Sequence, residues 1–238
     1  MIRLDLAGDG SGAQLQEETA PAPHWHFLFL AMVEFCMVFI RPGGKGLFAF
    51  LDLGRSAPRF LSVALVIYLA ETLYIIWGFC LTDRGRRFVN GAASSWPPRA
   101  GDILSGVTLG VGLMIGSIVI GTLLPGGHRR RFSFVKTGLD HLLLLVVYIV
   151  GSISEEIEFR GYFLQQLAVL TRSTSVAVVL QGIFFVFVHG PGQGLAGYLT
   201  RFAIGIALGL VAVARKSLWP SMTAHLLINM TVFIVELH

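Results

Sequence analysis

The chain is 238 residues long, and 54% of its residues are hydrophobic while only 13% are charged, against about 25% charged in a typical soluble protein. Its mean hydropathy is +0.72. This composition excludes an ordinary soluble domain and indicates an integral membrane protein. The net charge of +4 does not indicate nucleic-acid binding, because Lys and Arg lie in short segments between apolar runs, where basic residues flank membrane spans. The only cysteines, Cys36 and Cys80, support neither a disulfide framework nor a cysteine metal site.

The first forty residues divide into a polar segment and a short apolar run. Residues 1–24 are polar, rich in Gly, Ala and Pro, and lack the basic start and apolar segment of a secretory signal, so we expect a flexible tail. The apolar run 26–40 is short and contains Glu34. It fits either a tilted span or a helix lying at the membrane interface.

Two longer apolar runs follow, at residues 60–81 and 102–124, and each is long enough to cross a bilayer as a helix. Glu71 interrupts the first run; it is either a proton-relay or supporting group of a site, or, as we favour, a neutral or hydrogen-bonded acid between helices. In the second run, Gly106/Gly110 and Gly112/Gly116 have the small-xxx-small spacing that lets helix backbones approach closely. We therefore expect both glycine pairs to pack tightly.

A basic loop, residues 125–136 with Arg129 to Arg131, separates these runs from the C-terminal half. It fits contact with anionic headgroups or an acidic substrate, but a topology determinant is the favoured interpretation. Residues 139–170 then form one helical pattern roughly 48 Å long at 1.5 Å per residue, so it must tilt, kink near Gly151-Ser152 or emerge from the membrane.

Three further apolar runs, at residues 175–189, 196–214 and 218–235, complete the set. None of the runs shows the alternation of a barrel strand. The sequence therefore predicts an all-α, polytopic transmembrane bundle of about 6–8 membrane helices. We divide it into a tail (1–24), N-terminal transmembrane helices (25–138) and a C-terminal transmembrane core (139–238).

Four ionisable side chains fall within residues 154–160, where charge in hydrocarbon costs roughly 2.5–3.5 kcal/mol per residue. Glu156 and Arg160 are spaced i,i+4 with the acid first, which favours an ion pair. Glu155 points about 100° away and has no cation one turn along, so it is the candidate general base or acid. Glu158 either shares a proton with Glu155 or faces a headgroup.

Two later helices carry further polar pairs with i,i+4 spacing, Phe185 with His189 and His225 with Asn229. Each residue alone is more often a hydrogen bond between helices than a catalytic group. Together with Glu155, however, two imidazoles and an amide can converge on a single pocket.

These pairs resemble the three ordered signature motifs of the CPBP (CAAX protease and bacteriocin-processing, or Abi) intramembrane protease family, which includes the type II CAAX prenyl endopeptidases. The motifs are EExxxR at 155–160, FxxxH at 185–189 and HxxxN at 225–229, and the resemblance covers residues 139–236. It implies hydrolysis of a peptide bond within the membrane.

The resemblance also implies a role for each motif residue. Glu155 with His189 would activate the attacking water, and His225 with Asn229 would stabilise the oxyanion. Glu156 and Arg160 would hold the glutamate helix in place.

Metal dependence is left open by the sequence. His189, His225 and Glu155 are a possible zinc set, since two histidines, a glutamate and a water form a known catalytic site. There is no HExxH motif, and a glutamate-activated water needs no metal, so the favoured mechanism requires no cofactor.

Two other classes of function remain as alternatives: a proton-coupled transporter using these groups as a relay, and a non-catalytic immunity or scaffold protein. The absence of repeated halves disfavours the transporter. The expected partners are a membrane protein or lipidated peptide and the lipid bilayer, with no nucleic acid, and the expected location is the plasma membrane.

Overall fold

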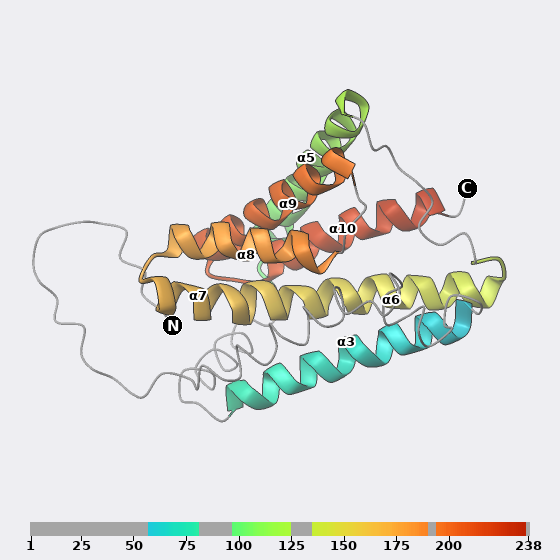
Figure 1. Cartoon of the computed structure of the whole chain (residues 1–238), viewed down its shortest axis with the longest axis horizontal. Coiled ribbons are helices and arrows are strands. Elements are labelled where there is room, and N and C mark those ends of the chain that lie inside the picture. The colour runs from blue at the N-terminus through green and yellow to red at the C-terminus, as the bar shows by residue number, and fades with distance from the viewer. Residues whose placement is uncertain (1–56, 81–96, 125–134, 190–193, 237–238) are drawn as a thin grey trace, which may run out of the picture.

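The structure is a computed structural model that describes residues 57–80, 97–124, 135–189 and 194–236 (Figure 1). Every regular element within these ranges is a helix, which confirms the all-α class. The predicted tail (1–24), the segment 26–40 and most of the basic loop 125–136 lie outside the described residues. The elements are α3 (Ala57–Cys80), α5 (Ala100–Leu123), α6 (Gly138–Glu156), the π-helix η3 (Ile157–Phe163), α7 (Leu164–Thr171), α8 (Thr174–Val188), α9 (Gly194–Arg215) and α10 (Trp219–Glu236).

A continuous helical rod made of α6, η3 and α7 runs through the middle of the molecule (Figure 1). It begins at a capping box, in which the hydroxyl of Thr137 accepts from the Asp140 N–H and the Asp140 carboxylate accepts from the Thr137 N–H, satisfying two N–H groups that the helix leaves unpaired. It ends before Arg172, whose φ of 53° is left-handed. Gly151 and Ser152, where a kink was considered, are both within the α-helical part of the rod. The irregularity is instead the π-helical segment, six residues later along the chain.

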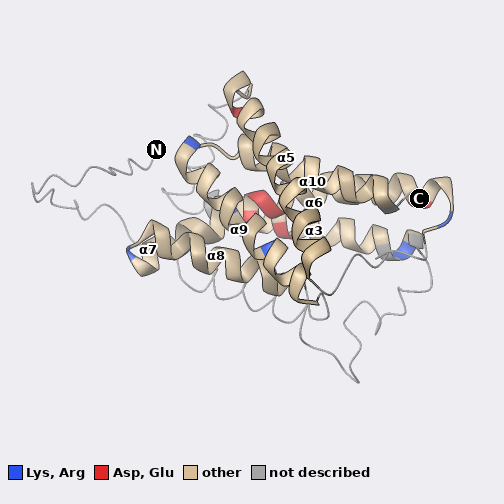
Figure 2. Ribbon diagram, turned by 90° about the horizontal axis from the view of Figure 1, so that it is seen from above, with Lys and Arg blue, Asp and Glu red and all other residues tan. Residues whose placement is uncertain are grey.

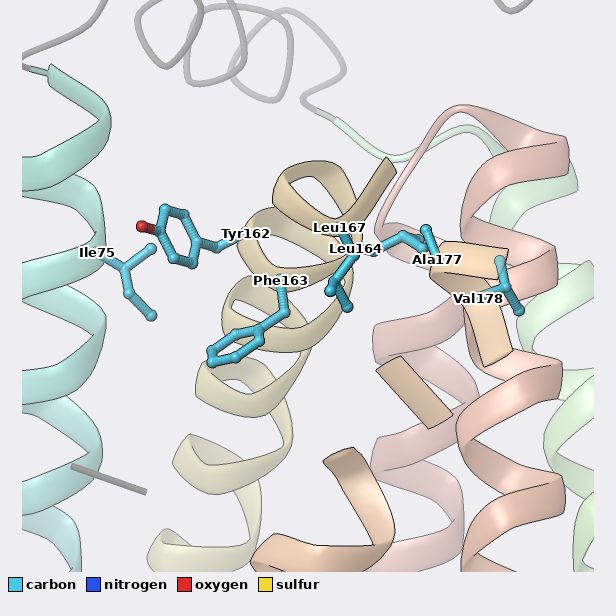
Figure 3. Close-up of a cluster of buried hydrophobic side chains, with 7 residues drawn as sticks. All are labelled: Ile75, Tyr162, Phe163, Leu164, Leu167, Ala177 and Val178. Carbon is cyan, nitrogen blue, oxygen red and sulfur yellow. The ribbon is translucent and has the colours of Figure 1, made fainter. Parts of the chain in front are cut away.

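Helix α3 packs along one side of this rod, and α8, α9, α10 and α5 lie on the other side (Figure 1). The buried cluster in Figure 3 shows how the rod is held between them: Tyr162 of η3 points toward Ile75 of α3, while Leu164 and Leu167 of α7 face Ala177 of α8. Burial of a full aliphatic or aromatic side chain stabilises by about 1.5–3 kcal/mol. This packing fixes η3, and with it the charged residues at its start, relative to α3 and α8.

Helices α5 and α10 approach closely at one of the two predicted glycine pairs. A Cβ on Gly106 would lie 2.6 Å from the Pro220 carbonyl oxygen and from Thr223 Cβ, and one on Gly110 would lie 3.2 Å from the Ala224 backbone. The expectation for Gly112/Gly116 is wrong, because a Cβ at either position meets nothing within 4 Å. This second pair faces away from the bundle, since 3.6 residues per turn carry it round the helix from the packed face.

By length and composition, two helices in the described part of the chain are able to cross a membrane, α5 and α9. Shorter apolar stretches are present at Leu61–Trp77, Thr174–Val188 and Trp219–Val235. The predicted all-helical bundle is thus supported, whereas the predicted number of 6–8 spans is not confirmed.

Candidate active site

One cavity, with a volume of about 190 Å³, brings together residues from all three motifs. Its wall includes Glu155 of α6, His189 at the end of α8, and His225 and Asn229 of α10. Figure 2 shows that acidic positions gather near the centre of the bundle, where these helices meet. The remaining lining residues come mainly from α3, α6 and η3: Tyr68, Glu71, Leu144, Val147, Tyr148, Gly151, Glu158, Phe159 and Val188.

Glu156 and Arg160 do not line this cavity but lie behind it as an ion pair. The side chains of both residues are fully buried, and Arg160 Nη1 donates to Glu156 Oε1 at 2.8 Å, so the predicted pair is present. The Arg160 guanidinium also lies 4.6 Å from the centre of the Phe185 ring and donates weakly to the Gly205 carbonyl at 3.4 Å. The cation is thus covered by an aromatic face and tied to α9, which compensates part of the cost of burying it.

His225 is oriented by the same buried carboxylate. Its Nδ1 lies 2.7 Å from Glu156 Oε1, and because a carboxylate only accepts, Nδ1 carries a proton. The other nitrogen, Nε2, lies 3.8 Å from Glu155 Oε2. Glu156 therefore fixes both Arg160 and His225, a second role that the spacing along one helix did not reveal.

Only one of the two carboxylate oxygens of Glu155 has a hydrogen-bond partner among the described residues. Its Oε1 accepts a hydrogen bond from Tyr68 Oη at 3.0 Å, whereas its Oε2 is buried and has no hydrogen-bond partner among the described residues. The predicted absence of a cation one turn away is confirmed, since the Arg160 guanidinium binds Glu156 instead. Tyr68 was not predicted as a site residue.

Asn229 is held by a short relay into α6. Its Nδ2 donates to Ser152 Oγ at 2.9 Å, and Ser152 Oγ in turn donates to the Tyr148 carbonyl at 2.7 Å. Because that amide nitrogen carries two hydrogens, one remains to be directed elsewhere. Ser152, which is fully buried, was also not predicted; its position four residues after Tyr148 is typical of a hydroxyl bonding to its own helix.

His189 directly follows Val188, the last residue of α8, and its Nδ1 lies 2.7 Å from the Phe185 carbonyl oxygen. That contact places a proton on Nδ1 and leaves Nε2 as the nitrogen with the lone pair. The Phe185 ring packs edge-on against both imidazoles, with centroid distances of 4.7 Å to His189 and 5.9 Å to His225. The phenylalanine of the FxxxH motif therefore packs against both histidines and helps to hold them in place.

The π-helix directly follows the two motif glutamates. It runs from Ile157 to Phe163, and within it Glu158 lines the cavity while Arg160 lies behind the cavity. Single π-helical turns inside α-helices are frequent at functional sites. Glu71, left open by the sequence, also lines the cavity.

The histidines have the arrangement that metal ligands often have, each with Nδ1 bonded to an oxygen. However, no group of three or more His, Cys, Asp or Glu side chains in the described ranges is arranged to hold a metal ion. The residues of the possible zinc set, Glu155, His189 and His225, thus share a cavity without forming a ligand set in this structure. We derive no step through a metal.

Comparison with known families confirms the resemblance seen in the motifs. Residues 137–231 match the family model described as type II CAAX prenyl endopeptidase Rce1-like. The C-terminal region is Rce1-like. This region contains every motif residue and excludes α3; at the family level it supports a membrane-embedded CAAX-type protease. No curated protein and no solved structure matches the chain.

Proposed function

We propose that this protein is an intramembrane endopeptidase that hydrolyses a peptide bond in a membrane-associated protein or peptide, with prenylated substrates as one class. The observation that carries the proposal is the convergence of Glu155, His189, His225 and Asn229 on one cavity inside the Rce1-like region. Acid, base and amide groups that come from three separate helices have no structural need to meet there.

In the proposed reaction, a water molecule in the cavity loses a proton to Glu155 and attacks the carbonyl carbon of the substrate. The lone-pair nitrogen of His189 assists by accepting a hydrogen bond from the same water. When the C–N bond breaks, Glu155 returns the proton to the leaving amine, so one water is consumed and two peptides are released. General acid–base catalysis of this kind contributes typically 10²–10⁴-fold to a rate.

The oxyanion that forms on the substrate carbonyl is stabilised by Asn229 and His225. Asn229 offers the hydrogen that it does not donate to Ser152. His225 donates from Nε2 when that nitrogen carries a proton, while its Nδ1 stays bonded to Glu156 Oε1. Removing one donor of such a site costs about 10²–10³-fold in kcat.

The proposed setting is a polytopic bundle of about 6–8 membrane helices in the plasma membrane. The substrate approaches from the bilayer or from its surface, because the cavity lining combines apolar residues of α6, Leu144 and Val147, with the polar groups of the motifs. A lipid-modified peptide, which carries both apolar and polar groups, matches this mixed lining.

The experiment is cleavage of a fluorogenic peptide panel, prenylated and unprenylated, by purified protein in detergent. We expect Glu155→Gln to lose about 10²–10⁴-fold in kcat and His225→Ala to lose a similar amount. His141→Ala, on α6 but outside the cavity, is the matched control and should retain activity. A Glu155→Gln variant with unchanged turnover would refute the mechanism, and a folded wild type that cleaves no member of the panel would favour the scaffold alternative.

The zinc-dependent version of the enzyme is tested in the same assay with a strong chelator. The metal-free mechanism predicts that activity survives chelation. Loss of activity on chelation, restored by added zinc, would instead establish a metalloprotease.

A further inference from the structure

Helix α3 lies outside the Rce1-like region, yet it supplies a hydrogen bond to the central carboxylate. Tyr68 Oη donates to Glu155 Oε1 at 3.0 Å across 87 positions of sequence. Tyr68 and Glu71, one turn further along α3, both line the cavity. The site is therefore incomplete without the N-terminal part of the chain.

The approach of Tyr68 depends on a glycine of α6. A Cβ on Gly151 would lie 3.1 Å from Cε2 and Cζ of the Tyr68 ring, closer than most contacts of a real Cβ. Gly151 and Glu155 are spaced i,i+4, so they lie on the same face of α6. The glycine provides the space in which the ring lies, and the glutamate one turn later receives its hydroxyl.

The hydrogen bond from Tyr68 makes the two carboxylate oxygens of Glu155 different from each other. Tyr68 occupies Oε1, whereas Oε2 has no hydrogen-bond partner among the described residues and lies 3.8 Å from His225 Nε2. A carboxylate that rotated freely about its last torsion would present either oxygen, since this torsion is broad and roughly two-fold. With Oε1 bound, Oε2 becomes the oxygen that can take a proton.

We infer that Tyr68 is a positioning residue, which binds Glu155 Oε1 in the space left by Gly151 and so presents Glu155 Oε2 to the attacking water. This inference rests on the proposed role of Glu155 as the base. Its hydroxyl acts through Glu155, the group to which it donates.

The first test is Tyr68→Phe, which keeps the ring and removes only the hydroxyl. Hydrogen bonds to charged groups contribute about 1.5–3 kcal/mol, so we expect kcat to fall roughly 10- to 100-fold while KM changes little. Tyr74→Phe is the matched control, because Tyr74 lies on the same helix, packs against the buried cluster of Figure 3 and does not line the cavity. Unchanged kcat in Tyr68→Phe would overturn the inference, as would a change confined to KM.

The second test is Gly151→Ala, alone and combined with Tyr68→Phe. The added methyl displaces the ring and lengthens the same hydrogen bond, so the double variant should lose little more kcat than Tyr68→Phe alone. Residues that act through one interaction are non-additive in this way. Fully additive losses would mean that Gly151 and Tyr68 contribute separately to packing, and would contradict the inference.

A third measurement separates this inference from the proposed function. The thermal unfolding of Tyr68→Phe, Glu155→Gln and the double variant in detergent gives the coupling between the two side chains without any catalytic assay. A positive coupling supports the bond between them, and additive shifts in Tm exclude it. An inactive wild type with coupled residues would remove the proposed function while leaving Tyr68 as the partner of Glu155.

Discussion

Asn229 is oriented by a hydroxyl group that does not itself line the cavity. Ser152 accepts from Asn229 Nδ2 and passes its own hydrogen to the Tyr148 carbonyl. The direction of this relay determines which edge of the amide faces the proposed oxyanion. In the proposed mechanism, Ser152 acts on the reaction through Asn229, as Tyr68 acts through Glu155.

We predict that Ser152→Ala lowers kcat about three- to tenfold, because a neutral hydrogen bond of about 1 kcal/mol is lost and the amide is free to rotate. Steady-state kinetics on the best peptide of the panel measure the effect. Ser154→Ala, a buried position on the same helix that does not line the cavity, serves as the control. Equal losses in both variants would indicate a general disturbance of α6 instead of a specific effect on Asn229.

Sequence spacing predicted contacts between residues on one helix and missed most contacts between helices. The Glu156–Arg160 ion pair was predictable because residues four apart share a helix face. The contacts of Glu156 with His225 and of Tyr68 with Glu155 join residues 69 and 87 positions apart. No periodicity in a single sequence shows which helices pack together, so these two contacts required the structure. The roles of the motif residues remain predictions.

At the scale of the helices, the apolar runs predicted the boundaries well. The run 102–124 corresponds to α5, Ala100–Leu123, and the run 218–235 to α10, Trp219–Glu236. The length of an apolar run is a direct consequence of burial or membrane contact, which is why it can be read locally. The π-helical segment was not predicted, because its residues, IEFRGYF, have no composition that distinguishes them from an α-helix.

The two glycine pairs of α5 allow one stability prediction in which a packed glycine is compared with an unpacked one. Gly106→Ala should destabilise the protein by about 1–3 kcal/mol, because its methyl collides with backbone and side-chain atoms of α10 that cannot move independently. Gly112→Ala should be neutral or slightly stabilising, since its methyl meets open space and alanine is the better helix former. Thermal unfolding in detergent compares the two variants. A larger loss at Gly112 would show that this face packs against another chain or segment.

At the scale of the whole molecule, α5 presents a broad apolar face away from the bundle. Leu104, Ile115, Ile118 and Leu123 are all more than half exposed, and α5 is one of the two described helices able to span a membrane. In water such a face would favour aggregation, whereas in a bilayer lipid covers it. We therefore assign this face to the lipid.

This assignment predicts the environment of a nitroxide spin label placed on α5. After replacement of Cys36 and Cys80 by serine, a label at Ile115→Cys in liposomes should be more accessible to oxygen than to a water-soluble nickel chelate. A label at Lys136→Cys, which is exposed just before α6, should show the reverse order. Preferential access of the nickel chelate to Ile115 would place α5 outside the bilayer.

The π-helical segment has a consequence for how this chain can vary. A turn closed between residues five apart, as between Leu164 N and Phe159 O, holds one more residue than an α-helical turn. It is equivalent to an insertion that shifts α7 out of phase with α6 by about 100°. Deleting a single residue from this segment would restore an ordinary helix but rotate the α7 surface away from α8, or else rotate the glutamates away from the cavity. The extra residue in the π-helical turn therefore allows a single continuous helix both to pack α7 against α8 and to place the glutamates at the cavity.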